Sequence, residues 1–343
     1  MSNLLEKVRK KITFLRHKTQ VNQKKTGFII GNTTKSLNPK AYFVPYRETP
    51  LMVTCGAIVY SEHDAMEIAK AVDGEVDYIL VDAEKKIADV DSTSGAPGNI
   101  ERAVRDVVFK SKLRTFKGND LSVDAADLLL TKIFEKETSG IGGKIITILG
   151  CGNLGTKLAL KLVERGANVR VTRRNHTLSK SIADVLNIIK PEYTTSCVTA
   201  YDCNHKACTG ADVIIGATQG HPVIMQSMLK IIAKSTIIID IGKGSIEKSM
   251  VPKLIEQGNI IYRLDIASAI AGVITSMFAI DASFEGAMGR KKMGEKFFVA
   301  GGMMGQRGDI VVDSIVNPKE VYGIADGAGD FLQDSKSLQL EDT

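Results

Sequence analysis

Short apolar segments alternate with helical segments from residue 144 onward, and this alternation restricts the fold more than any other feature of the chain. The apolar runs lie at residues 145–149, 168–172, 213–217 and 236–241. Runs of this length separated by helices are typical of parallel strands that are buried on both faces. The second half of the chain is therefore predicted to be an α/β domain with a doubly wound parallel sheet.

A glycine-rich loop follows the first of these strands and opens a helix. Its sequence is Gly150-Cys151-Gly152-Asn153-Leu154-Gly155, a G-x-G-x-x-G pattern. The first glycine permits a tight turn, the second lets a pyrophosphate approach the backbone, and the third allows close packing of helix on strand. The start of the helix also stabilises negative charge. The pattern in this position predicts a dinucleotide site rather than a merely tight turn.

The end of the second strand indicates which dinucleotide binds. A site for NAD would place Asp or Glu there, on the ribose hydroxyls. The chain has Thr172, Arg173 and Arg174 instead. A hydroxyl and two guanidinium groups suit a 2′-phosphate through charge-assisted hydrogen bonds, so the predicted cofactor is NADP(H). The alternative is that both arginines are ordinary solvated loop residues.

Two later strands end in small or polar residues. Ligands of open α/β sheets bind at the carboxyl ends of the strands, and small residues there let a nicotinamide ribose lie against the backbone. Tight loop packing would explain the same glycines. The residues predicted to contact the cofactor at these ends are Ala217, Thr218, Gln219, Ile241 and Gly242.

The first part of the chain alternates in the same way. Apolar runs at 26–32, 51–60 and 78–81 are predicted strands, and Ser61 with Asp64 opens a predicted helix over 61–72. The chain thus has an N-terminal α/β substrate domain followed by a doubly wound NAD(P)-binding Rossmann domain.

The boundaries follow from changes in pattern. Residues 100–137 are helical in pattern with a break at 117–120, and a Gly-rich connector follows them. Residues 266–280 are apolar on all sides, which predicts a helix buried between domains. We expect a basic amphipathic helix (1–25), an α/β substrate and catalytic domain (26–137), a Rossmann NADP-binding domain (138–265), and a returning helix with a C-terminal extension (266–343).

The positive charge is concentrated at one end. The 343 residues carry a net charge of +6, yet residues 1–25 hold eight basic side chains against Glu6 alone, so the remainder is nearly neutral. Leu4, Val8, Ile12 and Leu15 recur at helical spacing in this segment, which favours a helix docked on protein with solvated lysines. The alternatives are that this segment binds nucleic acid, an anionic membrane or a partner subunit, or that it serves as an organelle transit peptide. We expect no nucleic-acid partner.

Composition and cysteine content indicate a cellular compartment. The chain is 44% hydrophobic, which excludes a disordered protein and a disulfide scaffold. Its five cysteines are odd in number and lack the spacing typical of a disulfide framework. The apolar stretch at 266–280 is shorter than the roughly 20 residues that a bilayer requires. We expect a cytoplasmic homo-oligomer such as a dimer, with a small-molecule substrate and no membrane partner.

Residues that are candidates for proton transfer follow the predicted strand at 78–81. Hydride transfer between an alcohol and a carbonyl needs a group that moves the hydroxyl proton. Lys85 or Lys86 is the candidate acid/base, with Asp120 as its orienting carboxylate, although solvated loop lysines have the same sequence pattern. Cys203, His205 and Cys208 lack the second cluster of a closed zinc site, so no metal is predicted.

Polar loops of the N-terminal domain are candidates for binding substrate. Their hydroxyl and amide groups suit a carboxylate or several hydroxyls, whereas ordinary turn chemistry uses the same residue types. These candidates are Ser36, Asn38, Ser92, Thr93 and Ser94.

Three segments carry a resemblance to known families. Residues 30–39, Ile-Gly-Asn-Thr-Thr-Lys-Ser-Leu-Asn-Pro, are similar to the opening of shikimate dehydrogenases, and Gly118-Asn119-Asp120 is similar to their Asn-Thr-Asp. Residues 211–217 with 237–242 look like the cofactor strands of methylenetetrahydrofolate dehydrogenases. The order of domains resembles both families and the glutamyl-tRNA reductases.

The resemblance implies a two-domain, amino-acid-dehydrogenase-like architecture with substrate in the cleft between domains. The Asn-Val-Thr-x-Pro-x-Lys segment of shikimate dehydrogenases is absent, so the chain is a divergent member and not a shikimate dehydrogenase.

These observations predict an NADP(H)-dependent oxidoreductase that acts on a small polar, carboxylate-bearing alcohol or carbonyl compound. One alternative is a methylene-pterin dehydrogenase, for which Tyr42, Phe43 and Tyr46 form the early aromatic cluster. Another is a non-redox protein that binds NADP for sensing or as a scaffold.

Overall fold

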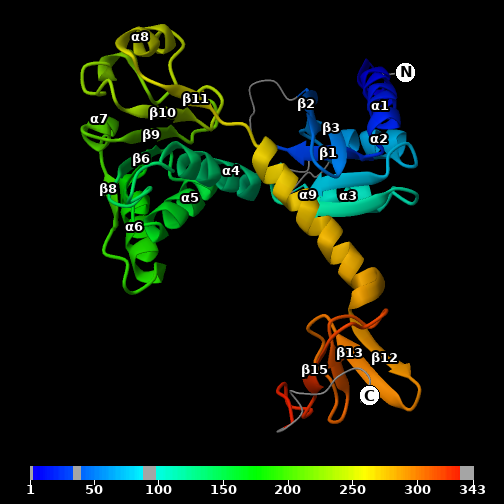
Figure 1. The fold of residues 1–343 in the computed structure, drawn as a ribbon. Helices are drawn as coiled ribbons and strands as arrows, with labels where there is room; N and C mark the ends of the chain where they lie inside the picture. Colours follow the sequence, from blue (N-terminus) through cyan, green and yellow to red (C-terminus); the bar gives the residue numbers. More distant parts are fainter. Residues whose placement is uncertain (1–2, 34–39, 88–97, 333–343) are drawn as a thin grey trace. The chain divides into compact units, whose positions relative to one another are not determined.

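A computed structural model describes residues 3–33, 40–87 and 98–332 (Figure 1). The chain divides into two compact units, residues 1–271 and 272–343. The first unit contains two sheets, which define an N-terminal lobe and a nucleotide-binding lobe.

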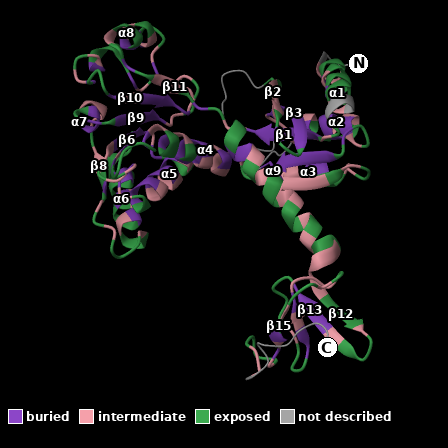
Figure 2. Cartoon of the chain, viewed as in Figure 1, coloured by how far each residue is buried: buried purple, intermediate pink, exposed green. Residues whose placement is uncertain are grey.

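The nucleotide-binding lobe is built on a six-stranded sheet in the order β11-β10-β9-β6-β7-β8, with every neighbouring pair parallel. This order confirms the predicted doubly wound sheet. Its central strands are buried (Figure 2). The strands are β6 (Ile145–Leu149), β7 (Asn168–Thr172), β8 (Val198–Tyr201), β9 (Val213–Gly216), β10 (Ile237–Asp240) and β11 (Ile261–Arg263), and the helices are α5 (Asn153–Glu164), α6 (His176–Ile189), α7 (Asn204–Cys208) and α8 (Met250–Gln257).

One helix expected in this lobe is absent. Residues 223–233 have a helical pattern, but the structure has only the 3-10 turn η1 (Gln226–Met228) there. The backbone N–H groups of Val223 and Ile224 both donate to the Ser245 carbonyl, and Ile224 forms a bridge with Ile246. These bonds hold the start of the segment in an extended conformation, so a full helix cannot begin there.

The N-terminal lobe has a five-stranded sheet in the order β2-β3-β1-β4-β5, parallel except at the β2–β3 pair. Ser61 caps α2 by accepting a hydrogen bond from the Asp64 N–H, as the sequence predicts. The elements are α1 (Asn3–Asn22), β1 (Lys25–Asn32), β2 (Tyr42–Glu48), β3 (Met52–Val59), α2 (Glu62–Val72), β4 (Tyr78–Asp82), α3 (Ile100–Arg105), β5 (Lys112–Phe116) and α4 (Gly118–Ile133).

The helical pattern over residues 100–137 is wrong at its centre. Lys112–Phe116 forms the edge strand β5, which pairs in parallel with β4. Pairing with an already formed strand outweighs local helical preference in a segment as short as this one.

The first helix docks on the N-terminal lobe. Val8, Ile12 and Leu15 are buried in the core that also contains Phe28 of β1, whereas Lys7 and its basic neighbours are exposed. The predicted amphipathic helix with solvated lysines is therefore present.

Replacement of Leu15 by alanine is expected to lower the free energy of unfolding by about 2–5 kcal/mol, because it leaves a cavity in a fully packed site. Urea unfolding of the purified protein measures this loss. Arg9→Ala, an exposed change on the same helix, is the control and should stay within about 0.5 kcal/mol of wild type. Equal losses for both variants would contradict the docking of α1 on the core.

The second unit contains a small sheet of its own, in the order β12-β13-β14-β15. Phe298, Ala300, Ile310 and Val312 form its core. Its strands are β12 (Gly289–Met293), β13 (Lys296–Ala300), β14 (Ile310–Val312) and β15 (Val321–Ile324).

The apolar helix α9 (Ala267–Ala282) spans the boundary between the units and continues into the π-helical turn η2 (Ser283–Ala287). Its buried side chains are confined to its first half, so the expectation of a buried helix is wrong (Figure 2). With η2 it is 21 residues long, and it is the one helix in the described residues whose length and hydropathy would allow it to cross a bilayer. This length includes Asp281 and Glu285, so the uncharged stretch itself is as short as the sequence indicates.

Candidate functional site

The glycine loop between β6 and α5 has the geometry of a dinucleotide site. Gly150 has a φ of 109°, and a Cβ there would lie 2.8 Å from the Ala217 carbonyl oxygen. A Cβ at Gly155 would lie 2.3 Å from the Gly150 carbonyl oxygen. In contrast, a Cβ at Gly152 would meet no described atom within 4 Å. The outer glycines therefore close the turn, and the middle one faces open space where a phosphate group fits.

The start of α5 supplies the electrostatics for an anion. Gly152 is the N-cap and has no side chain with which to cap the helix. The first N–H groups of a helix lack intrahelical partners, and the helix dipole places partial positive charge there. Gly152, Asn153 and Leu154 all line the cleft in front of this helix end. The residues present thus fit a pyrophosphate.

The carboxyl end of β7 carries the groups expected at the adenosine end of the cofactor. The buried Thr172 accepts hydrogen bonds at its carbonyl from the N–H groups of Gly150 and Cys151. Arg173 donates to the Cys151 carbonyl at 3.0 Å, and both Arg173 and Arg174 are exposed where they line the cleft. Burial raises the pKa of the Cys151 thiol, so this side chain stays neutral beside the phosphate site.

A second group of residues lies at this end of the cleft, where the sequence did not place it, although Cys203 and His205 were weighed as metal ligands. Asp202, Cys203, Asn204 and His205 follow the short strand β8 and line the same cleft. No cluster that could hold a metal ion occurs among the described residues. Recognition of residues 198–201 as a strand would have placed these side chains at the carboxyl edge of the sheet.

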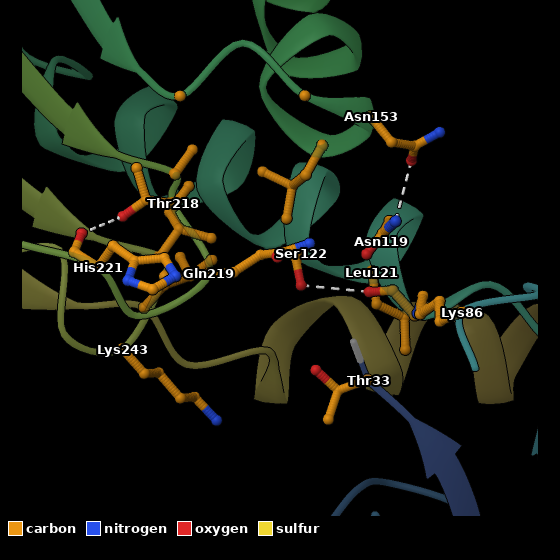
Figure 3. Close-up of a pocket in the computed structure, with 18 of the residues that line it drawn as sticks. Thr33, Lys86, Asn119, Leu121, Ser122, Asn153, Thr218, Gln219, His221 and Lys243 are labelled. Atoms are coloured by element: carbon orange, nitrogen blue, oxygen red, sulfur yellow. Dashed lines mark hydrogen bonds between the residues drawn. The ribbon is translucent and has the colours of Figure 1, made fainter. Parts of the chain in front are cut away.

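The ends of β9 and β10 form the other side of the cofactor site. All five predicted residues here, from Ala217 to Gly242, line the cleft. A Cβ at Gly242 would lie only 1.9 Å from the Thr218 carbonyl oxygen, so this position requires glycine. Thr218 donates to the His221 carbonyl at 2.6 Å, which holds the loop closed (Figure 3).

Lys243 is a further residue of this loop that the sequence did not single out. It lines the cleft and adopts a left-handed backbone conformation with a φ of 53°. A residue other than glycine in this conformation is uncommon and indicates a position that the surrounding structure imposes. Figure 3 shows its side chain, together with Thr218 and His221, on the opposite side of the site from Lys86.

The two lobes enclose one cleft of about 1560 Å³. From the nucleotide-binding lobe come the residues just described. From the N-terminal lobe come Asn32, Thr33, Asp82, Glu84, Lys86 and Asn119. Reactive groups of the N-terminal lobe therefore share a single space with the predicted cofactor site.

Lys86 is the central charged group of the N-terminal side. Its Nζ lies 2.7 Å from Asp82 Oδ2 and 2.7 Å from Glu84 Oε2. The side chains of Lys86, Asp82 and Glu84 are only 14%, 2% and 13% exposed. A Cβ at Gly118 would lie 2.8 Å from Lys86 Nζ, so glycine is needed there for this arrangement. The ammonium group is thus held in one place at the cleft by two carboxylates.

Lys85 is oriented differently from Lys86. Its Nζ donates to Asn99 Oδ1 at 2.7 Å and lies 3.5 Å from Glu101, although part of the residue also lines the cleft. The ion pair with two nearby carboxylates therefore distinguishes Lys86 from its neighbour.

The predicted pairing of Asp120 with Lys85 or Lys86 is absent. Asp120 instead pairs with Lys157 at 2.5 Å and with Lys117 at 3.0 Å, because Asp82 and Glu84 lie on the same turn as Lys86 and occupy its ammonium group. Burial acts to raise the pKa of Asp120, but the hydrogen bonds and charges of Lys157 and Lys117 outweigh it and hold the pKa below its ordinary value. The hydrogen bond that Lys157 donates to Asp120 raises the pKa of Lys157 in turn. Asp120 is therefore a structural ion-pair residue.

Helices α4 and α5 are joined by ion pairs along their length. Besides Asp120 with Lys157, Asp124 pairs with Lys161, and Asp127 pairs with Arg165. These ion pairs fix α4 to α5, the helix whose first turn forms the predicted phosphate site.

The predicted substrate residues Ser36, Asn38, Ser92, Thr93 and Ser94 lie outside the described residues, and their role stays a prediction. Within the described chain, the polar groups on this side of the cleft include Asn32, Thr33 and Ser122. The Oδ1 atom of Asn32 is buried without a hydrogen-bond partner among the described residues.

Residues 145–244 match the protein family described as "NADP oxidoreductase coenzyme F420-dependent". Over 108 residues the chain is 32% identical to a glycerol-3-phosphate dehydrogenase [NAD(P)+] of Clostridium botulinum (strain Alaska E43 / Type E3). That match covers 29% of this chain and 32% of the relative, so the chain spans about a third of the length of the curated relatives it matches.

Similar solved structures include an L-tryptophan dehydrogenase from Nostoc punctiforme, with 11% identity, a TM-score of 0.43, and coverage of 76% of this chain and 77% of that one. A shikimate dehydrogenase in complex with NADP+ has 17% identity, a TM-score of 0.41, and coverage of 75% and 90%.

The family match spans β6 to the loop after β10, which is the part of the chain that carries the glycine loop and both strand ends of the cofactor site. This segment is similar to the NADP oxidoreductases of the matched family, in agreement with the dinucleotide site that the sequence predicts. The family is described as NADP-dependent, whereas the name of the relative includes both NAD and NADP. NAD(P) is the cofactor class that these matches support.

Proposed function

We propose that the chain, a divergent two-domain Rossmann protein of the NAD(P)-dependent oxidoreductase class, transfers hydride between NADP(H) and a small polar, carboxylate-bearing alcohol or carbonyl compound. The observation that carries this proposal is the shared cleft, in which the ion-paired Lys86 and the Gly150–Gly155 loop are both lining groups. Such a reaction requires a proton-transfer group and a cofactor site in the same cleft.

The cofactor choice rests on charge. Arg173 and Arg174 are exposed at the end of β7 and line the cleft, where a 2′-phosphate would accept charge-assisted hydrogen bonds. Gly150, Gly152 and Gly155 would hold the pyrophosphate with the first N–H groups of α5. When bound, NADP(H) supplies or accepts the hydride.

Lys86 would move the proton. When a carbonyl is reduced, its oxygen gains negative charge and requires a proton, and Lys86 Nζ is positioned by Asp82 and Glu84 to donate one. In the opposite direction the neutral amine accepts the hydroxyl proton. The two carboxylates hold the amine in place and balance its charge when it is protonated.

The substrate class follows from the remaining lining groups. Asn32, Thr33 and Ser122 offer hydrogen bonds to hydroxyl or carbonyl oxygens, and Lys243 offers positive charge to a carboxylate. This composition favours a small polar acid over a macromolecule. We also propose that the protein is cytoplasmic and homo-oligomeric, as its sequence suggests.

A methylene-pterin substrate is the second candidate, because Tyr42 and Phe43 line the cleft as well. Aromatic side chains there could stack on a pterin ring. For such a substrate the hydride comes from a carbon between two nitrogens, and Lys86 would have no hydroxyl proton to move. Loss of Lys86 would then affect the rate much less than it would for an alcohol.

A substrate panel tests the proposal. Purified protein is mixed with NADPH and a set of small oxo acids, or with NADP+ and the matching hydroxy acids and a methylene-pterin, while absorbance of the reduced nicotinamide is followed. We expect turnover with at least one acid. Tight NADPH binding without turnover on any compound would favour the non-redox sensor or scaffold.

A further inference from the structure

A continuous series of polar contacts connects the phosphate-binding loop to Lys86. Asn119 Nδ2 donates to Asn153 Oδ1 at 2.9 Å, and the Asn119 backbone N–H donates to Glu84 Oε2 at 2.7 Å. The same Glu84 oxygen lies 2.7 Å from Lys86 Nζ. Each contact is within ordinary hydrogen-bond length, so no link in the series requires a bridging group.

The series crosses from one lobe to the other. Asn153 is the first residue of α5 and follows Gly152, the glycine that faces the predicted phosphate position. Asn119 is in the first turn of α4, and Glu84 follows β4. Figure 3 shows the oxygen of the Asn153 carboxamide directed at Asn119 and its nitrogen directed away. Asn119 therefore connects the first residue of α5 to the carboxylate that holds Lys86, next to the ion pairs that join α4 and α5.

The orientation of Glu84 depends on this contact. One of its carboxylate oxygens receives both the Asn119 N–H and the Lys86 ammonium group, while the other lies 3.6 Å from Lys157. Because Glu84 is only 13% exposed, water offers it few alternative donors. Displacement of the α4 start would therefore move the carboxylate that holds Lys86.

We propose that Asn119 is a positioning residue that couples occupancy of the phosphate loop to the placement of Lys86. Bound pyrophosphate fixes the first turn of α5, Asn153 then holds the Asn119 side chain, and the Asn119 backbone holds Glu84 against Lys86. The inference rests on the proposed cofactor site. It adds that the two halves of that site are coupled, so that Lys86 is held most firmly when the cofactor is present.

Chemical labelling of Lys86 tests the coupling without any knowledge of the substrate. The full chain is treated with a limiting amount of an amine-reactive ester, with and without ADP-ribose 2′-phosphate, and modification of Lys86 is measured by peptide mass spectrometry. This probe occupies the phosphate sites but lacks the nicotinamide that could cover Lys86 directly. In wild type, saturating probe should slow labelling by about threefold, the size of coupling usual between residues in contact.

The variants separate the coupling from simple shielding. Asn119→Ala should still bind the probe, yet its Lys86 labelling should no longer respond to it. Asn119→Leu keeps a similar volume but can neither donate to Asn153 nor accept from it, and should also lose the response. Lys161→Ala, which breaks a neighbouring α4–α5 ion pair outside the series, is the matched control and should respond like wild type.

The outcomes are distinguishable. An unchanged response in both Asn119 variants would overturn the coupling, as would probe binding to wild type with no change in labelling. Wild type that fails to bind the probe in a calorimetric titration would overturn the cofactor assignment and the coupling with it.

Discussion

Replacement of Lys86 by methionine is expected to lower kcat by about 10²–10⁴-fold, the usual contribution of a positioned proton-transfer group. Methionine fills a similar volume but can neither donate nor accept the proton. Lys86 Nζ contacts Asp82 and Glu84 and is not part of the glycine loop, so affinity for NADPH should change little. Steady-state kinetics on the acid found in the panel, with a fluorescence titration of NADPH, measures both quantities.

Lys85→Met is the matched control for this experiment. Lys85 is adjacent in sequence, but its ammonium group contacts Asn99 and Glu101. We expect kcat of this variant to stay within about threefold of wild type, as for most changes to partly exposed residues. Comparable losses in both variants, or a large loss of NADPH affinity in Lys86→Met alone, would contradict the proton-transfer role.

Replacement of both Arg173 and Arg174 by alanine is expected to weaken NADPH binding by roughly 10–100-fold. Both arginines are exposed, so we assign the pair the contribution of a single hydrogen bond to a charged group, about 1.5–3 kcal/mol in total. About 1.4 kcal/mol corresponds to a tenfold change in affinity. NADH lacks the 2′-phosphate, so its affinity should fall by less than about threefold. Parallel titrations with the two cofactors give the comparison within a single variant.

The ratio of the two losses is decisive for the cofactor assignment. Equal weakening of NADPH and NADH would show that the arginines support the loop rather than select a phosphate. The contact of Arg173 with the Cys151 carbonyl makes that outcome physically reasonable, since its loss could loosen the glycine loop for either cofactor.

The cofactor half of the site could be predicted from sequence because its signals are local. A strand, three glycines and a helix start follow one another within a few residues, and their geometry depends little on the rest of the chain. The structure brings the predicted residues of this half to one cleft, except Gly155, which packs α5 against the turn at Gly150. The later group at Asp202–His205 was missed because β8 is a short strand with a weak apolar pattern.

The proton-transfer half could be predicted only as a short list. Lys85 and Lys86 are equivalent in sequence, and the side chains around them decide which is held at the cleft. The sequence does not reveal the partners of Asp120, which are Lys117 just before α4 and Lys157 of α5 in place of Lys85 or Lys86.

Errors in the fold have a similar origin. Residues 112–116 have no strong strand pattern, yet β4 offers a paired edge that the local sequence does not reveal. The apolar residues of α9 predicted burial, but composition alone does not determine what a helix packs against. In each case, contacts distant in sequence outweighed the local pattern.

The most direct test of the account is a crystal structure of the protein with NADPH bound. The account predicts the pyrophosphate on the Gly150–Gly155 loop, the 2′-phosphate against Arg173 and Arg174, and the nicotinamide within the cleft on the side that faces Lys86. A nicotinamide directed out of the cleft, with Lys86 remote from its reactive carbon, would contradict it.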